Sequence, residues 1–445
     1  MSEFITIQVG QCGNQIGSAF WPLVLQEYSI SNVPGGIARR NAIPTRKIHD
    51  TDSFYSFFSA NENFNLNTIL KYSDLRKFNV KARAILIDME DSVVDRYHNG
   101  PLKCLFDKTC TIKNFPGSGN NWAEGYLTHG SKYRSIIENI LRRSVEMCNG
   151  LHGFLLMYSV GGGTGSGLGS YVLQLLEELY PNIDRFVTCV YPNGTEDVIT
   201  CPYNMALATK SLTNHATCVF PIENRQLLDI VNKQRSQKEC VDTLNYIIKC
   251  KPFQDMNTII VNMLLHLTSS VSPITVSYDH CRKQRNGRKI HNDIFVNCCS
   301  RKNQLLKLDP LGTNSVLIGA ALIGRGDFIV SDMRDYVDQI QNRARFTPWS
   351  KNAIKIGLCG VPPVGHDSSM LTLFNSSAMC SLFTEVQQQF TRLYNKKAHV
   401  HHYTKIEGFE TTFFDECNES LLRNIENYSL LNRMRSIYRP RFTVL

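Results

Sequence analysis

The sequence predicts an α/β protein with a doubly wound, mostly parallel sheet, followed by a core helix, a second α/β domain and C-terminal helices. Short apolar runs recur through the first half of the chain without regular polar alternation, which is typical of parallel strands buried on both faces. Segments with helical spacing of apolar residues separate these runs, so strands and helices alternate. The 445 residues also exceed what one hydrophobic core usually serves, so we expect more than one packed unit.

The first half of the chain is expected to contain five strands, at residues 4–9, 84–87, 154–158, 186–190 and 218–220. After residue 168, leucine and valine recur on one helix face, and Pro181 ends that helix. The polar, irregular stretch 31–79 is interpreted as a long surface loop.

The second half begins with residues 255–267, DMNTIIVNMLLHL, which are apolar nearly all round, as expected for a helix buried between two layers. Strand and helix signals return over residues 314–373, and helical spacing resumes at about residue 381. The predicted organisation is a first domain over residues 1–250, a core helix over 251–268, a second domain over 269–380 and a C-terminal helical region over 381–445.

The net charge of +9 is unevenly distributed. Residues 281–302 hold seven Lys/Arg against one acid, and residues 421–445 hold five Arg against one. Because aromatic residues are few among these charges, we interpret the two runs as a solvated loop and tail, and expect no nucleic-acid partner. No run approaches ~20 apolar residues and no signal peptide begins the chain, so we expect a cytoplasmic protein without a membrane span. Trp122 and Trp349 are expected in cores.

Residues 159–169, SVGGGTGSGLG, hold six glycines in eleven residues, between an apolar run and a helical segment. Glycine lets backbone N–H groups approach anionic oxygens, and the following helix adds the positive end of its dipole. The lysine of a P-loop is absent, and the dinucleotide pattern GxGxxG fails at Leu168. A flexible linker is disfavoured because strand and helix signals flank the stretch so clearly. These features predict a phosphate-binding turn.

Four other turns are polar or rich in glycine, and three of them directly follow predicted strands. They are GQCGNQ at 10–15, DMED at 88–91, GSGNNW at 117–122 and YPNGTEDV at 191–198. In open α/β sheets, ligands bind at the carboxyl ends of the strands. The five turns together therefore predict a single site at that edge.

These motifs resemble those of the tubulin superfamily. GQCGNQIG, GSGNNWAEG, GGGTGSGLG, PYN and KKAHVHHYTKIEGFE occur in that family's order, and the likeness extends over nearly the whole chain. Within the family, PGSGNNWA, RFVTCVYPNGTEDVITCPYN and CGVPPVGH are more similar to the ε branch than to the α, β or γ branches. The resemblance implies that residues 1–250 are a tubulin-type GTPase domain that binds GTP and Mg²⁺.

The resemblance also implies which residues hold the phosphates: a first loop, a loop near the γ-phosphate and the glycine turn itself. These residues are Gly10, Gln11, Cys12, Gln15, Ser118, Gly119, Asn120, Ser159, Gly161, Gly162, Gly163, Thr164 and Gly165. For Mg²⁺ the resemblance implies two acids, Asp88 and Glu90, and for the ribose it implies Asp197. For the base it implies two carboxamides at the edge, Asn224 and Asn257, and the stacked ring of Phe253.

Three departures from the family's pattern affect the prediction. Cys201 stands where the family has a glutamate before PYN that meets the ribose. Residues 268–304 lack the family's G-x-x-N-x-D segment, which supplies a catalytic acid, so no catalytic residue is assigned and hydrolysis by this chain is in doubt. The atypical segment is either genuine divergence or the loss of an exon, and the otherwise continuous match favours the loss. The acidic tail of α and β subunits is also missing.

Three functions are considered. The first is a GTP-binding structural protein of the microtubule cytoskeleton at the centrosome, centriole, basal body and cilium, which helps to assemble or stabilise doublet and triplet microtubules. Its expected partners are δ-tubulin or α/β-tubulin and centriolar proteins. The second is a GTP-binding adaptor that pairs with another tubulin, such as δ-tubulin, without polymerising. The third, a nicotinamide-dependent enzyme, is disfavoured by the mismatch at Leu168 and by the lack of a recognisable catalytic base.

Overall fold

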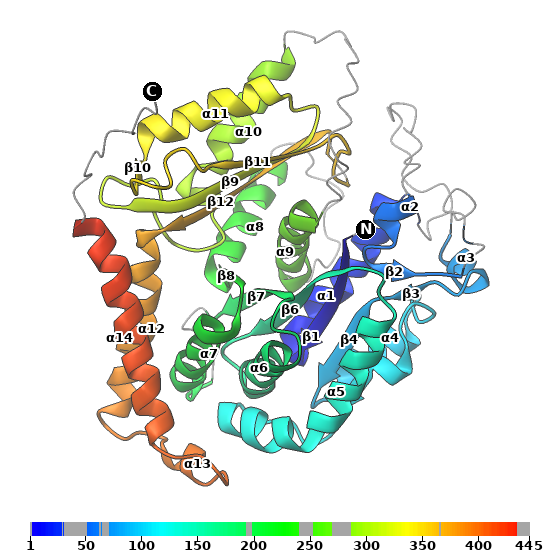
Figure 1. Cartoon of the computed structure of the whole chain (residues 1–445), viewed down its shortest axis with the longest axis vertical. Coiled ribbons are helices and arrows are strands. Elements are labelled where there is room, and N and C mark those ends of the chain that lie inside the picture. Colours follow the sequence, from blue (N-terminus) through cyan, green and yellow to red (C-terminus); the bar gives the residue numbers. More distant parts are fainter. Residues whose placement is uncertain are drawn as a thin grey trace, which may run out of the picture. The chain divides into compact units, whose positions relative to one another are not determined.

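The computed structural model describes residues 2–28, 30, 51–61, 64, 71–192, 198–239, 252–268, 286–364 and 366–433 (Figure 1). The chain divides into two compact units. The first comprises Met1–Arg225, Lys251–Val261 and Gln389–Cys417, and the second comprises Gln226–Cys250, Asn262–Gln388 and Asn418–Leu445. Among the described residues, no helix is long and apolar enough to cross a membrane.

A six-stranded parallel sheet forms the centre of the first unit, in the order β5-β4-β1-β6-β7-β8. Its strands are β1 (Glu3–Val9), β4 (Ala84–Asp88), β5 (Thr111–Lys113), β6 (Leu151–Ser159), β7 (Asp184–Tyr191) and β8 (Cys218–Glu223). The chain builds outward from β1 through β4 to β5, and then returns to the other side of β1 with β6. The strand order therefore reverses between β1 and β6.

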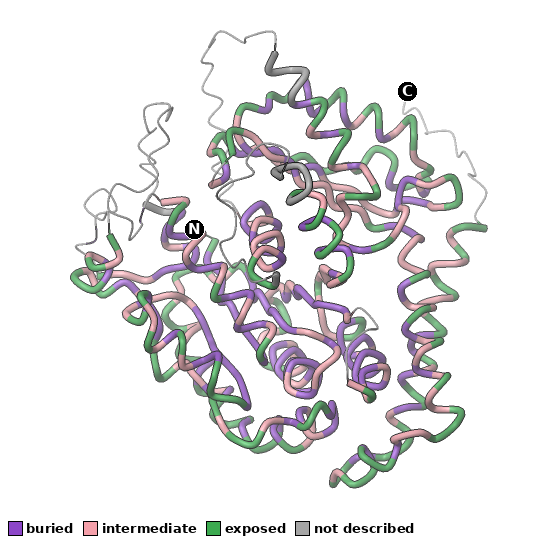
Figure 2. The backbone as a smooth tube through the Cα atoms, turned by 180° about the vertical axis from the view of Figure 1, so that it is seen from behind, coloured by how far each residue is buried: buried purple, intermediate pink, exposed green. Residues whose placement is uncertain are grey.

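Helices lie between these strands or follow the last of them. They are α1 (Gly10–Glu27), α4 (Asp91–Asn99), α5 (Gly130–Glu146), α6 (Gly169–Leu179), α7 (Cys201–His215), α8 (Asn224–Glu239) and α9 (Pro252–Thr268), with a 3₁₀ turn η2 (Lys108–Cys110) and π-helices η3 (Glu124–His129) and η4 (Thr164–Leu168). Helix α1 packs against β1, β4 and β6, and α6 packs against β6 and β7. The strands β1 and β4 are buried along their whole length, as the purple tube in Figure 2 shows.

The predicted α/β class and all five predicted strands are confirmed. Strand β5 was not predicted, because Thr111–Lys113 has only three residues and one apolar side chain, which is too short for a strand pattern. The core helix is present as α9, whose buried residues include Ile260, Val261 and Leu264. The glycine-rich turn leads through η4 into α6, as predicted.

The interpretation of residues 31–79 as a surface loop is wrong for their described part. This part contains α2 (Thr51–Phe54), β2 (Phe58–Ser59), which pairs with β3 (Lys81–Ala82), and α3 (Tyr72–Lys77). Phe54 is fully buried and stacks on Phe58 and Phe64, with ring centroids 4.6 and 4.7 Å away. Aromatic side chains set in a polar stretch thus bury enough apolar area to fold it onto the sheet.

The second unit is built around the long strand β9 (Val316–Gly326). Strands β10 (Arg345–Phe346) and β11 (Lys355–Cys359) run parallel to it, and β12 (Ser368–Ser376) runs antiparallel. The remaining elements of the two units are α10 (Asn286–Cys298), η5 (Arg301–Asn303), α11 (Val330–Arg343), η6 (Ser377–Met379), α12 (Cys380–Tyr394), α13 (His401–Thr404) and α14 (Thr412–Arg433). Trp349, in the turn between β10 and β11, is 62% exposed, so its predicted core position is wrong, whereas Trp122 is buried as predicted.

Helix α10 corrects the interpretation of residues 281–302 as a solvated loop. Within the described residues this basic run forms a helix with an apolar face. Phe295 stacks on Tyr336 of α11 with centroids 4.3 Å apart, and Cys298 Sγ donates to the carbonyl oxygen of Met370 at 3.0 Å. Phe295 also belongs to the buried cluster that contains Leu322 of β9. The helix therefore completes the hydrophobic core of the second unit.

Substitution Phe295→Ala is expected to destabilise the second unit by about 3–5 kcal/mol, because it leaves a cavity in that core. The matched control is Val296→Ala on the same helix, since Val296 is 56% exposed and its loss should change the free energy of unfolding by no more than about 0.5 kcal/mol. Urea denaturation followed by circular dichroism measures both. Equal, small effects for the two variants would show that α10 does not belong to the core.

Candidate nucleotide-binding site

Two backbone turns meet where the strand order reverses. The turn after β1 begins at Gly10, which has φ +71°, and a Cβ at Gly10 would lie 3.0 Å from the amide nitrogen of Gly165. A Cβ at Gly13 would overlap the carbonyl oxygen of Met157 in β6. Only glycine permits this approach of α1 and its turn to the turn after β6. The reversal point is the place where open α/β sheets bind ligands.

The glycine turn after β6 has one closed side and one open side. Cβ atoms at Gly163 and Gly165 would lie 2.6 Å from the Asn121 nitrogen and 2.7 Å from the Ser159 oxygen, so both glycines face protein backbone. At Gly162 the nearest atom is 3.9 Å away. Ser166 Oγ donates to the carbonyl oxygen of Gly162 and fixes the turn. The turn then enters the π-helix η4, a geometry that is frequent at functional sites.

The loop 118–120 lies beside this turn. Ser118 is buried and its Oγ is 3.0 Å from Thr164 Oγ1. Gly119 and Asn120 both have φ +53°, and a Cβ at Gly119 would meet nothing within 4 Å. Gly119 and Gly162 thus leave open space on adjacent loops, as a cradle for anionic oxygens requires.

Asn204, the last residue of the PYN motif, holds these two loops together. Its Nδ2 donates to the carbonyl oxygens of Asn120 at 2.8 Å and Gly161 at 2.9 Å. The family resemblance includes this motif but implies no role for Asn204. The available signal was an asparagine in the first turn of a helix at the sheet edge, and the sequence could not show which carbonyls it meets.

Asp88 ends β4 at the same edge and is 2% exposed. Desolvation, followed by repulsion from Glu90, raises the pKa of its carboxyl from 3.8 to about 7. Among the described residues, Asp88 Oδ2 has no hydrogen-bond partner. Glu90 is exposed, and its Oε1 lies 3.2 Å from where a Cβ of Gly117 would stand. A buried carboxylate oxygen without compensation, beside a second acid, fits the hard oxygen donors that Mg²⁺ requires.

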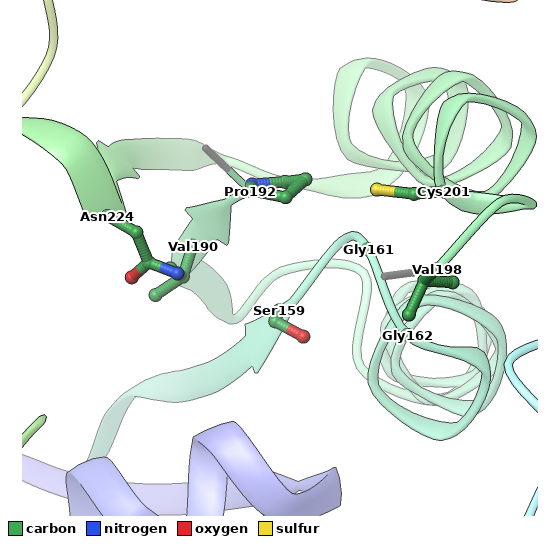
Figure 3. A pocket seen from close by; sticks show the side chains of 8 residues that line it. All are labelled: Ser159, Gly161, Gly162, Val190, Pro192, Val198, Cys201 and Asn224. Carbon is green, nitrogen blue, oxygen red and sulfur yellow. The ribbon is translucent and has the colours of Figure 1, made fainter. Parts of the chain in front are cut away.

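A cavity of about 120 Å³ opens beside the glycine turn (Figure 3). The residues that line it are Ser159, Gly161, Gly162, Val190, Pro192, Val198, Cys201 and Asn224. Cys201 Sγ lies 3.2 Å from where a Cβ of Gly161 would stand. The predicted base contact Asn224 and three predicted phosphate contacts, Ser159, Gly161 and Gly162, thus line the same cavity. The other lining residues are apolar side chains and Cys201.

The other predicted residues are placed less directly. On the first turns of α1, Gln11 is exposed and Gln15 half-buried, and burial raises the pKa of the Cys12 thiol to about 12. Phe253 is 61% exposed and Asn257 is half-buried, one turn apart on α9. Neither of the α9 residues lines the cavity. Asp197 lies outside the described residues.

The strand order and the glycine turns are those of doubly wound α/β domains that bind nucleotides. The chain matches the GTPase domain of the Tubulin/FtsZ family over residues 3–232 and the tubulin C-terminal domain over residues 263–388. The chain therefore belongs to the tubulin family.

Its relatives include the tubulin epsilon chains of Mus musculus and Homo sapiens, each 37% identical over 482 aligned positions. The alignments cover 99% and 98% of this chain, respectively, and 98% of each relative. The tubulin beta chain of Enteroctopus dofleini is 28% identical, with 98% of this chain and 96% of that protein covered. Because 482 positions exceed the 445 residues of the chain, the epsilon relatives contain segments that this chain lacks.

The stability of the nucleotide-free protein is expected to fall as the pH rises from about 4 to about 7. An unfolded aspartate is already ionised above about pH 4, whereas folded Asp88 must ionise near pH 7 in a buried site, at a cost of up to about 4 kcal/mol. Asp88→Asn should abolish most of this loss, whereas Asp91→Asn, at an exposed neighbouring acid, should keep it. Thermal unfolding at several pH values provides the measurement, and an unchanged pH slope in Asp88→Asn would contradict the assignment.

Proposed function

We propose that the chain binds GTP with Mg²⁺ at the edge where β1 and β6 meet. The observation that carries this proposal is the open cradle at Gly119 and Gly162, at the same sheet edge as the buried Asp88, whose Oδ2 has no hydrogen-bond partner among the described residues. Backbone amides of the two glycine turns would hold the phosphates together with Gln11, Cys12 and Gln15, and Asp88 and Glu90 would hold Mg²⁺. The bound ion would supply positive charge against the phosphate oxygens.

The nucleoside would extend from the glycine turn along the cavity. Asn224 lines this cavity, and a carboxamide both donates and accepts, which suits the mixed edge of guanine. Phe253 and Asn257, four residues apart on α9, share one helix face, and the exposed Phe253 ring is free to stack on a base. Asp197 is proposed as the ribose-side acid.

For the role in the cell, we favour a structural tubulin of centrioles and basal bodies that contributes to doublet and triplet microtubules. This part of the proposal is supported by the likeness to tubulin epsilon chains. Its partners would be α/β-tubulin or δ-tubulin and centriolar proteins. The alternative is an adaptor that pairs with δ-tubulin without polymerising. It is favoured by the sequence after α9, which lacks the G-x-x-N-x-D segment of the family.

GTP binding is tested with a fluorescent GTP analogue and Mg²⁺, with unlabelled GTP and NAD as competitors. GTP should displace the analogue and NAD should not. Gly162→Ala should weaken binding at least about tenfold, or about 1.4 kcal/mol, because its Cβ occupies the open face of the cradle and clashes with no protein atom, the nearest being 3.9 Å away. The matched control is Gly360→Ala, at a glycine of the second unit with nothing within 4 Å of its Cβ position. Equal affinities for the two variants would refute this site.

Assembly is tested by sedimentation with GTP, alone and with purified α/β-tubulin or δ-tubulin. Polymer supports the structural role, whereas a discrete heterodimer supports the adaptor. In either case the isolated chain should release negligible phosphate from GTP, because it lacks the segment that supplies the family's catalytic acid. Robust turnover by the monomer would contradict that expectation.

A further inference from the structure

The carboxamide of Asn204 is fully buried and uses its whole hydrogen-bonding capacity. Its Nδ2 donates to the carbonyl oxygens of Asn120 and Gly161, and its Oδ1 accepts from the Trp122 amide at 2.9 Å and from the Tyr403 hydroxyl at 2.6 Å. A carboxamide has two N–H donors and two lone pairs, so every one of them is engaged. One side chain therefore joins the loop 118–122, the glycine turn and a tyrosine from the end of the chain.

Tyr403 belongs to the segment 398–404, which includes α13 and lies in the same compact unit. Its buried ring packs on Phe409 and Phe414, with centroids 5.5 and 5.2 Å away. A second bond ties this segment to the site, since Asn121 Nδ2 donates to the His402 carbonyl oxygen at 2.8 Å. The segment thus has a buried side bonded to the phosphate loops and an exposed side that carries His401 and His402.

The bonds of Asn204 act on backbone in an uncommon conformation. Asn120 has φ +53°, which non-glycine residues rarely adopt, and within the described part of the chain its carbonyl oxygen accepts from Asn204 and from Thr200 Oγ1. The adjoining Gly119 and Gly162 face open space. Together with the contact between the Ser118 and Thr164 hydroxyls, the orientation of the Asn204 carboxamide therefore sets the separation of the two loops, and hence the width of the cradle.

The geometry points to Asn204 as a positioning residue that sets the width of the phosphate cradle, and to Tyr403 as the residue that orients Asn204 from the segment 398–404. The effect on nucleotide affinity rests on the proposed GTP site, but the positioning of the loops does not.

The test compares two buried tyrosines. Tyr403→Phe removes the hydroxyl that orients Asn204. Tyr203→Phe removes a hydroxyl that donates to the Ala398 carbonyl oxygen at 2.7 Å, in the same segment but without a bond to Asn204. Hydrogen exchange of the nucleotide-free proteins is measured for residues 118–126 and 159–168. Tyr403→Phe should accelerate exchange in both stretches and Tyr203→Phe should leave them unchanged.

Nucleotide affinity provides the second measurement. Tyr403→Phe should weaken binding of the fluorescent GTP analogue about three- to tenfold, as the loss of one buried hydrogen bond implies, and Tyr203→Phe should not weaken it. Asn204→Asp, which keeps both acceptor sites and loses both donors, should have a larger effect in the same direction. Asn204→Asp also serves as the test variant in both measurements if Tyr403→Phe does not fold.

The inference is overturned if Tyr403→Phe and Tyr203→Phe accelerate exchange equally, or if both leave the two loops unchanged. Failure of the proposed function has a different signature, because wild-type protein would then neither bind the analogue nor gain protection with GTP. In that case the nucleotide-free exchange still decides whether Asn204 and Tyr403 position the loops.

Discussion

The backbone contact between the first turn of the chain and the glycine turn after β6 is the constraint on which the site depends. Gly10 and Gly165 approach so closely that no side chain fits between them. This contact sets α1 over β6 and places two helix N-termini, each with unpaired N–H groups, at the point where the strand order reverses. The turn that begins at Asp88 and the loop 118–120 then complete the described part of this edge.

The second unit shows the role of the described part of the atypical segment. Helix α10 contributes Phe295 and Cys299 to a core with residues of β9, α11 and β12. Residues 286–300 are thus a structural part of this protein. The longer alignments with the epsilon relatives are consistent with a shortening of the chain, and they do not show where it lies. A changed catalytic segment and an intact core therefore coexist in one domain.

The sequence predicted those parts of the fold whose signal is local. Parallel strands such as β1 and β6 are buried on both faces and appear as unbroken apolar runs, and the glycine turn is marked by its own composition. Elements that depend on distant partners were missed or misinterpreted. Phe54 and Phe58 lie in a polar stretch of sequence that predicts a loop, but their rings stack and are buried. Trp349 was expected in a core because of its residue type, but it is exposed. Asn204 was unpredictable for the same reason, since its four partners come from three separate stretches of the chain.

The position of Trp122 has a consequence for how this protein can be observed. Its amide is bonded to Asn204, its ring stacks on Tyr126 with centroids 4.3 Å apart, and its Nε1 donates to Ser170 at 3.3 Å. The other two tryptophans lie in contrasting surroundings, Trp21 among phenylalanine rings and Trp349 in solvent. The intrinsic fluorescence of the chain thus combines one buried emitter among aromatic rings, one solvent-exposed emitter, and Trp122, whose backbone amide is bonded to Asn204. Trp122 is therefore an intrinsic optical probe next to the candidate nucleotide-binding site.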